Sequence, residues 1–290
     1  MQDLFNYLQR INLNIHNLSI SEIKSVETVH GYQCNVNNKD GSVLAGGTSK
    51  DKNIAIRIAI AEAFERLLAL SIHRNEVLRD EFLLQHFPSS SGFAAGFDNN
   101  KTKFRAICEG LERWVWSKWI DEGFKLERFI PKKSFSNLAN FLIQSFNETY
   151  WFEKKFDIKI EESKAIELKI VIFLGCTEEG VFPGSRVSTE ADDLFEHSII
   201  EAHRNFTNYH LHLESPLTLQ DIIQERVIFY GSNKKLAFEQ IDRATNIDWP
   251  EAKIRILKSL TTDHPNLFLY RCLFEDFIGW HEGDVTRFVY

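Results

Sequence analysis

The feature that most restricts the fold is a charged pattern, Glu-x-x-Glu-Arg, that occurs twice inside long apolar stretches. The two copies are Glu62, Glu65 and Arg66, and Glu109, Glu112 and Arg113. Residues three apart lie on the same face of a helix, so each copy presents two carboxylates side by side, with an arginine next to them. Apolar residues surround the first copy on nearly all sides, which predicts a largely buried helix. We therefore expect two helices that carry charged clusters into the protein interior.

Carboxylates in such apolar helices are costly unless a cation or hydrogen-bond donors neutralise them. Mg²⁺ takes hard oxygen ligands and typically combines one or two protein carboxylates with substrate phosphates. Arginine suits phosphate oxygens because of its planar fork of donors. A magnesium–nucleotide site is one interpretation of the pattern. The alternative is that each copy forms an ordinary glutamate–arginine pair on a solvated helix face, and the pattern alone leaves both open.

Hydrophobic periodicity gives the coarse fold. It predicts long helices over about 51–73, 99–121 and 189–212. Extended patterns cover 22–46, with Asp40-Gly41 as a hairpin turn, and 156–176. Gly46-Gly47 is expected to break the chain before the first long helix, and no Pro/Gly/Ser-rich linker interrupts the sequence. We predict an α+β fold in a single domain over residues 1–290.

Charge and composition exclude several classes of protein. The chain has 34 Lys+Arg against 41 Asp+Glu and a net charge of −7, which argues against holding nucleic acid or an anionic membrane by bulk charge. No apolar run approaches the ~18 residues of a membrane span, and the first residues lack the basic start and apolar run of a signal peptide. The four cysteines include no Cys-x-x-Cys pair and are expected to be buried, reduced thiols. These features predict a cytoplasmic protein without nucleic-acid or membrane partners.

Three segments in order resemble the YcaO family. Ser90-Ser91-Gly92-Phe-Ala-Ala-Gly96, followed by the second Glu-x-x-Glu-Arg copy, resembles the family's S-N-G-x-A-x-G loop and E-x-x-E-R helix at matching separation. Gly47-x-Ser49 with Ala55, Ala59 and the first copy is similar to its first nucleotide-binding helix. Gly184-Ser185 with Glu201 and Arg204 resembles its third, although this spacing alone is typical of surface ion pairs. The resemblance covers about residues 46–206.

The resemblance implies a single YcaO-like domain of mixed sheets and helices with the nucleotide site between them, and ATP and Mg²⁺ as cofactors. It implies Glu62, Glu65, Glu109 and Glu112 as metal ligands, and Ser49, Arg66, Arg113, Glu201 and Arg204 as nucleotide-binding residues. In the family, ATP phosphorylates a backbone amide oxygen of a peptide or protein substrate after a nucleophile adds to the amide carbon, giving an azoline, thioamide or amidine. The nucleophile comes from the substrate or a sulfur donor, so no catalytic side chain is assigned.

Several positions depart from the family pattern. Each of these positions carries a residue other than the one common in the family. They are Thr48 in place of lysine, Ile58 in place of serine, Ser91 in place of asparagine, Trp114 in place of aspartate, and Arg105 and Arg204 in place of glutamine. The proline-rich end of the azoline-forming members is also lacking. The carboxylates are kept while nucleotide contacts are altered. A second hypothesis is therefore a degenerate YcaO-like protein that binds nucleotide or a partner without turnover.

The aromatic residues have two interpretations. Core packing is the default for the run Trp114, Trp116 and Trp119, and the surplus of large aromatic residues also suggests a binding partner. Large aromatic side chains are enriched at interfaces, and here they cluster beside the second charged copy and in the tail. They are Trp114, Trp116, Phe277, Trp280, Phe288 and Tyr290. We expect a homodimer or a complex with a companion protein, and a C-terminal segment that is ordered and partly buried.

Overall fold

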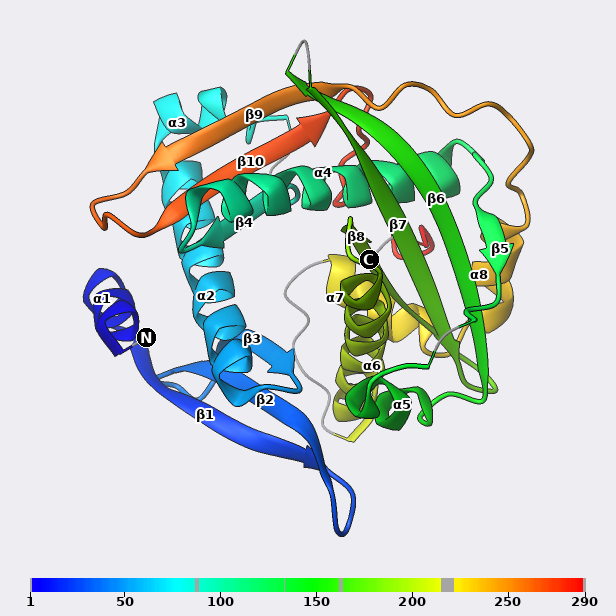
Figure 1. The fold of residues 1–290 in the computed structure, drawn as a ribbon, viewed down its shortest axis with the longest axis horizontal. Helices are drawn as coiled ribbons and strands as arrows, with labels where there is room; N and C mark the ends of the chain where they lie inside the picture. Colours follow the sequence, from blue (N-terminus) through cyan, green and yellow to red (C-terminus); the bar gives the residue numbers. More distant parts are fainter. Residues whose placement is uncertain (1, 87–88, 133, 162–163, 215–221, 289–290) are drawn as a thin grey trace. The chain divides into compact units, whose positions relative to one another are not determined.

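The structure is a computed structural model that describes residues 2–86, 89–132, 134–161, 164–214 and 222–288. Its helices and antiparallel sheets are drawn in Figure 1. The chain forms two compact units. Unit 1 contains Met1–Ala106 and Lys258–Arg271, and unit 2 contains Ile107–Leu257 and Cys272–Tyr290. The single-domain organisation over 1–290 stays a prediction, and each unit is described by itself.

Unit 1 begins with α1 (Gln2–Ile11) and an antiparallel sheet in the order β1-β2-β3. Its strands are β1 (Ile15–Lys24), β2 (Val29–Asn38) and β3 (Val43–Ser49). The predicted hairpin turn is confirmed, because Gly41 has a φ of +85° and the Asn38 N–H donates to the Ser42 carbonyl at 2.8 Å. The predicted break at Gly46-Gly47 is wrong, since both glycines lie within β3.

Helix α2 (Lys52–Arg74) follows β3 and packs on it, and the short α3 (Glu76–Glu81) comes next. Asp51 caps α2 by accepting the Ile54 N–H at 2.9 Å. Gly47 allows the helix to approach the strand, because a Cβ added there would lie 2.6 Å from the Ala59 nitrogen. The small residues Ala55 and Ala59 lie at this contact, and both are fully buried.

The remaining strands around unit 1 form a second sheet in the order β4-β10-β9. Strand β4 (Phe93–Gly96) pairs antiparallel with β10 (Phe268–Phe274), and β9 (Ile254–Thr261) completes the sheet. The buried Arg271 on β10 donates to the carbonyls of Phe82, Ser89 and Ser91. This arginine therefore fixes the glycine-bearing loop before β4. Helix α4 (Asn99–Asp121) begins in unit 1 and continues into unit 2.

Unit 2 is built on an antiparallel sheet in the order β5-β6-β7-β8. Its elements are β5 (Glu127–Phe129), α5 (Asn137–Ile143), β6 (Glu148–Glu161), β7 (Lys164–Cys176), β8 (Val181–Ser188), α6 (Ala191–Glu214), α7 (Ile222–Tyr230) and α8 (Lys234–Ile241). Residues Ile170–Leu174 of β7 are fully buried, which confirms the predicted strand with both faces covered. Helix α6 packs on β8 beside Gly184, where a Cβ would lie 2.6 Å from the Ala202 nitrogen.

Both units repeat one local arrangement. In each, three consecutive antiparallel strands, β1–β3 in unit 1 and β6–β8 in unit 2, precede a helix, and a glycine on the last of them lets that helix approach closely. In unit 1 the glycine is Gly47 and the nearest helix atoms belong to Ala55, Ile58 and Ala59; in unit 2 it is Gly184 with Ser198, Glu201 and Ala202. Ile58 therefore occupies on α2 the position that Glu201 occupies on α6, because each places its Cβ next to the glycine. The α+β class predicted from sequence is confirmed.

The aromatic side chains belong to the core of unit 2. Trp114, Trp116, Phe277, Trp280 and Phe288 are all buried within the chain, while Tyr290 lies outside the described residues. Their expected role as an exposed partner surface is wrong, because aromatic packing inside the unit already covers them. The expectation that the C-terminal segment is ordered and partly buried holds as far as Phe288.

Two further expectations can be compared with the structure. All four cysteines are free and buried, and burial raises the pKa of the Cys108 thiol to about 12. Among the residues that the structure describes, no helix combines the length and apolar character needed to cross a bilayer.

Candidate functional site

The first charged copy lies on the second half of α2 in unit 1. Arg66 donates to the Glu62 carboxylate and to the Leu44 carbonyl, both at 2.5 Å, so it ties the helix to the start of β3. Glu62 and Glu65 are both partly buried. Ser49 is buried at the end of β3, and its hydroxyl accepts the Asp51 N–H at 3.2 Å. Ser49 therefore helps to form the turn into α2.

The second copy lies on α4 in unit 2 and is more enclosed. Arg113 forms an ion pair with Glu109 at 2.7 Å, and Glu112 is only 4% exposed. Burial and the nearby Glu109 carboxylate raise the pKa of Glu112 to about 8, and Arg113 offsets part of this effect. Burial alone would lower the pKa of Arg113, but the Glu109, Glu112 and Glu201 carboxylates outweigh it and raise that pKa. The group is an acidic cluster that carries one strongly held cation.

The third segment joins this acidic cluster. Glu201 on α6 accepts the Ser185 N–H at 2.7 Å and contacts Arg204 at 3.4 Å. Its carboxylate also contributes to the raised pKa of Glu112. The Trp116 indole N–H donates to the Ser185 hydroxyl at 2.9 Å, which links α4 to β8. The structure therefore brings together Glu109, Glu112, Arg113 and Glu201 within unit 2, as their assignment to one site requires.

Sequence reasoning did not assign two further groups to this cluster. Arg186 on β8 pairs with Asp193 through two hydrogen bonds, at 2.8 and 3.3 Å, and lowers the pKa of Glu112. Trp280 places its ring under the Arg113 guanidinium, 3.7 Å from the ring centroid to the guanidinium carbon. Spacing along the sequence gives no signal for either contact, since only tertiary packing brings these side chains together.

The acidic cluster supplies carboxylate oxygens, the type of ligand that Mg²⁺ prefers, and its role in holding this ion stays a prediction. Among the described residues, no three His, Cys, Asp or Glu side chains form a ready metal-binding group. The carboxylates pair instead with arginines of their own helices: Glu62 with Arg66, Glu109 with Arg113, and Glu201 with Arg204. However, Mg²⁺ typically uses only one or two protein carboxylates. The raised pKa of Glu112 means that its charged form is costly in this surrounding, and a bound cation would stabilise that form.

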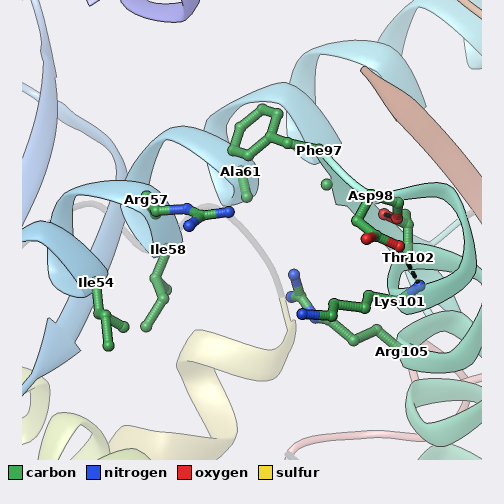
Figure 2. A pocket seen from close by; sticks show the side chains of 10 residues that line it. Ile54, Arg57, Ile58, Ala61, Phe97, Asp98, Lys101, Thr102 and Arg105 are labelled. Atoms are coloured by element: carbon green, nitrogen blue, oxygen red, sulfur yellow. Dashed lines mark hydrogen bonds between the residues drawn. The ribbon is translucent and has the colours of Figure 1, made fainter. Parts of the chain in front are cut away.

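A separate pocket of about 250 Å³ lies in unit 1 between α2 and the start of α4 (Figure 2). Its lining includes the departures Ile58 and Arg105, together with Arg57 and Lys101, which sequence reasoning did not single out. Ile54 and Ile58 are 50% and 36% exposed on this side of α2. The prediction that α2 is buried nearly all round is therefore wrong at this face, since the pocket opens there.

The chain combines repeated sheet–helix units with an acidic cluster on the helices. Comparison with solved structures shows that this is a YcaO-like fold. YcaO from Methanopyrus kandleri bound with AMPPCP and Mg²⁺ matches with a TM-score of 0.58 at 12% identity, covering 93% of this chain and 89% of that one. A chain of the E. coli microcin synthetase McbBCD complex with pro-MccB17 bound matches with a TM-score of 0.61 at 10% identity, covering 89% and 88%.

A heterocyclase in complex with substrate and cofactor also matches, with a TM-score of 0.56 at 11% identity, over 95% of this chain but 52% of that one. The sequence itself matches no protein-family model and no curated protein. At these identities the structural similarity establishes the fold. It confirms the resemblance to the YcaO family at the level of the fold. The roles of individual site residues stay predictions.

Proposed function

We propose that this protein activates a backbone amide of a peptide or protein substrate in an ATP- and Mg²⁺-dependent reaction. The observation that carries the proposal is Glu112, a carboxylate that is 4% exposed and whose pKa is raised to about 8 beside two further carboxylates. Such a group is costly to keep charged without a cation. A YcaO-like fold with solved relatives that hold AMPPCP and Mg²⁺, or a peptide substrate, supports the same reading.

In this proposal, Glu109 and Glu112 hold the metal, while Arg113, Glu201 and Arg204 position the nucleotide. Glu62, Glu65, Arg66 and Ser49 keep their predicted roles as further metal and nucleotide contacts. Bound ATP supplies the phosphoryl group that turns the amide oxygen into a leaving group. Arg113 stays charged at neutral pH because three carboxylates hold its proton, so it offers fixed donors to phosphate oxygens. Glu112 must lose its proton before it can bind a metal.

A second candidate function is binding without turnover, and two departures favour it. Trp114 is buried, and its indole N–H donates to the Glu275 carbonyl at 2.8 Å, so it supplies packing where the family has an aspartate. Ile58 offers only an apolar surface where Glu201 accepts a hydrogen bond in the repeated arrangement. Under this reading the protein would bind nucleotide or a companion protein but release no phosphate.

A companion protein is part of the proposal. One solved relative is a chain of a multi-protein synthetase with its pro-peptide bound. We propose that substrate recognition here also involves a companion or a second copy of the chain.

Phosphate release separates the two candidate functions. Purified protein is incubated with ATP and Mg²⁺, with and without candidate peptides and companion proteins. The Glu112→Gln variant removes the proposed ligand. The matched control is Glu122→Gln, directly after the end of α4, which alters the ion pair with Lys118 of that helix. Peptide-stimulated release by wild type and Glu122→Gln, but not by Glu112→Gln, supports the enzyme. Tight ATP binding with no release under any peptide supports the binding protein instead.

A further inference from the structure

A second pocket, of about 310 Å³, lies in unit 1 beside strand β9. Strand β9 forms one edge of its sheet, next to β10 (Figure 1). The lining comes from these two strands, the loop between them and Asn99 at the start of α4. The volume lies at the lower end of the range of about 300–1,000 Å³ that is usual for ligand pockets.

The outer edge of β9 has unpaired backbone groups next to this pocket. Strand β9 pairs with β10 on one side, and within the described residues no other backbone hydrogen bond involves Ser259, Leu260 or Thr261. Free N–H and C=O groups on an edge strand are a template for a further strand. An extended peptide satisfies them by adding to the sheet, and a pocket beside the edge then selects one of its side chains.

Three of the lining side chains lie on the face of the sheet away from the core of unit 1. Leu260 packs against that core and Leu269 belongs to it. Because side chains alternate along a strand, Ser259 and Thr261 of β9 and Phe268 of β10 lie on the other face. Ser259 and Thr261 are exposed, and Phe268 is half-buried. The lining therefore combines an aromatic ring with two small hydroxyl side chains.

Two polar side chains of the lining have unused hydrogen-bond donors. The Tyr270 hydroxyl donates to Asn99 Oδ1 at 2.6 Å, which leaves the Asn99 amide N–H groups for a ligand. His264 Nδ1 accepts the Asn266 N–H at 3.2 Å, so the neutral ring carries its proton on Nε2. In the part of the chain that the structure describes, no group accepts a hydrogen bond from either donor.

These contacts favour an uncharged aromatic side chain in the pocket. The described lining contains no Asp, Glu, Lys or Arg. A tyrosine ring would pack on Phe268, and its hydroxyl would accept from Asn99 or His264. Lys258, the preceding residue of β9, is exposed and forms no ion pair with a described residue. Since Lys258 and Ser259 lie on opposite faces, Lys258 fits an acidic residue adjacent to the tyrosine in the peptide.

A second copy of β9 fits this edge less well. On the pocket face it would bring only Ser259 and Thr261, whose side chains are too small to fill about 310 Å³. It would also add a second Lys258 at the same edge, and like charges across paired strands are destabilising. The observations favour a different chain with a larger side chain.

We propose that β9 binds the peptide substrate as an added strand, with an uncharged aromatic residue of the peptide in this pocket and an acidic residue beside it. This inference rests on the proposed function, because it names where the substrate of that function is recognised. The contact requires neither ATP nor Mg²⁺, so it can be measured apart from phosphate release.

The test uses the full-length protein without ATP or Mg²⁺, and a fluorescent peptide, Gly-Ser-Asp-Tyr-Thr-Ser-Gly. Fluorescence anisotropy measures its binding to wild type, Ser259→Trp and Thr261→Trp, in which an exposed residue becomes large enough to fill the pocket. The matched control is Ser21→Trp, at an exposed serine of the edge strand β1. We expect saturable binding by wild type and control, weakened about tenfold or more in both pocket variants. Melting temperatures check that all variants fold.

Two altered peptides test the individual contacts. Alanine in place of tyrosine should weaken binding to wild type about tenfold or more, because the pocket stays empty. Lysine in place of aspartate should weaken it about two- to fivefold, and Lys258→Glu should reverse that preference. The proposal is overturned by absence of saturable binding, by equal affinity for the tyrosine and alanine peptides, or by equal affinity of the pocket variants and Ser21→Trp. A wild-type dimer that Ser259→Trp dissociates would also overturn it, because a second copy would then occupy β9.

Phosphate release separates a failure of this inference from a failure of the proposed function. If the peptide does not bind at β9 but peptide-stimulated release still depends on Glu112, only the site on β9 is wrong. If the peptide binds as expected but release does not depend on Glu112, only the proposed function is wrong.

Discussion

The Arg113 guanidinium lies 3.7 Å from the centroid of the Trp280 ring, and the Trp280 indole N–H donates back to the Arg113 carbonyl at 3.3 Å. Glu109 holds the same guanidinium from another side at 2.7 Å. Arg226 fixes the segment that carries Trp280 by donating to the carbonyls of Trp280, Glu282 and Asp284. The C-terminal segment therefore contributes to the orientation of Arg113 in the acidic cluster of unit 2.

Replacing Trp280 should lower the stability of the fold and remove the ring that holds the Arg113 side chain in position. We expect Trp280→Ala to lower the free energy of unfolding by about 3–5 kcal/mol, as for other buried large-to-small changes. Trp280→Phe keeps an aromatic face under Arg113 and should lose clearly less. Chemical denaturation of both variants checks this. Equal losses for the two variants would show that the ring face does not matter to Arg113.

The raised pKa of Glu112 predicts a pH-dependent stability of the metal-free protein. Its folded pKa of about 8 lies above the ordinary value of 4.5, so between these pH values the folded state keeps a proton that the unfolded state has released. Stability should therefore fall as pH rises from about 4.5 to 8 and then level off. Melting temperatures in EDTA from pH 5 to 9 test this.

The Glu112→Gln variant provides the comparison for this pH profile. It cannot ionise, so it should be more stable than wild type near pH 8 and show a flatter profile. Parallel profiles for the two proteins would mean that Glu112 titrates normally, and the charge argument for the acidic cluster would be lost.

Gly47 should tolerate no side chain, because β3 and α2 need its close approach. A Cβ there lies 2.6 Å from the Ala59 nitrogen, so Gly47→Ala must push the helix from the strand. We expect a loss of about 1–3 kcal/mol, as for overpacked sites. Gly41→Asn is the control: its φ is +85° and no atom lies within 4 Å of the added carbon, and asparagine adopts this conformation. If unfolding experiments give the same stability for both variants, the packing explanation for Gly47 is wrong.

The helices were predictable because their apolar period is long and regular. Helix α4 has the predicted bounds. Helix α2 runs from Lys52 to Arg74, within one residue of the predicted bounds at each end. Strand β8 was not predicted, and it contains Pro183 and Gly184; it is the edge strand of its sheet, where proline is tolerated. Short strands such as β4 carry too few residues to show a period.

The candidate site was predictable where one helix supplies it. The Glu-x-x-Glu-Arg spacing placed Glu109 beside Arg113, and the glycine before Glu201 pointed to the third segment. Trp280 and the pocket between α2 and the start of α4 could not be predicted, because their residues meet through packing of segments far apart in the sequence. Periodicity reports which face of an element is apolar and not which other element covers it.

The most direct test of the central claim is calorimetric titration of Mg²⁺ and ATP at pH 7.5 in two buffers of different ionisation enthalpy. If Glu112 binds the metal, wild type and the Glu122→Gln control should bind and release up to about one proton, because the metal displaces the proton of Glu112. Glu112→Gln should lose binding while keeping its fold. Equal affinity in all three proteins, or binding without proton release by wild type, would contradict the account.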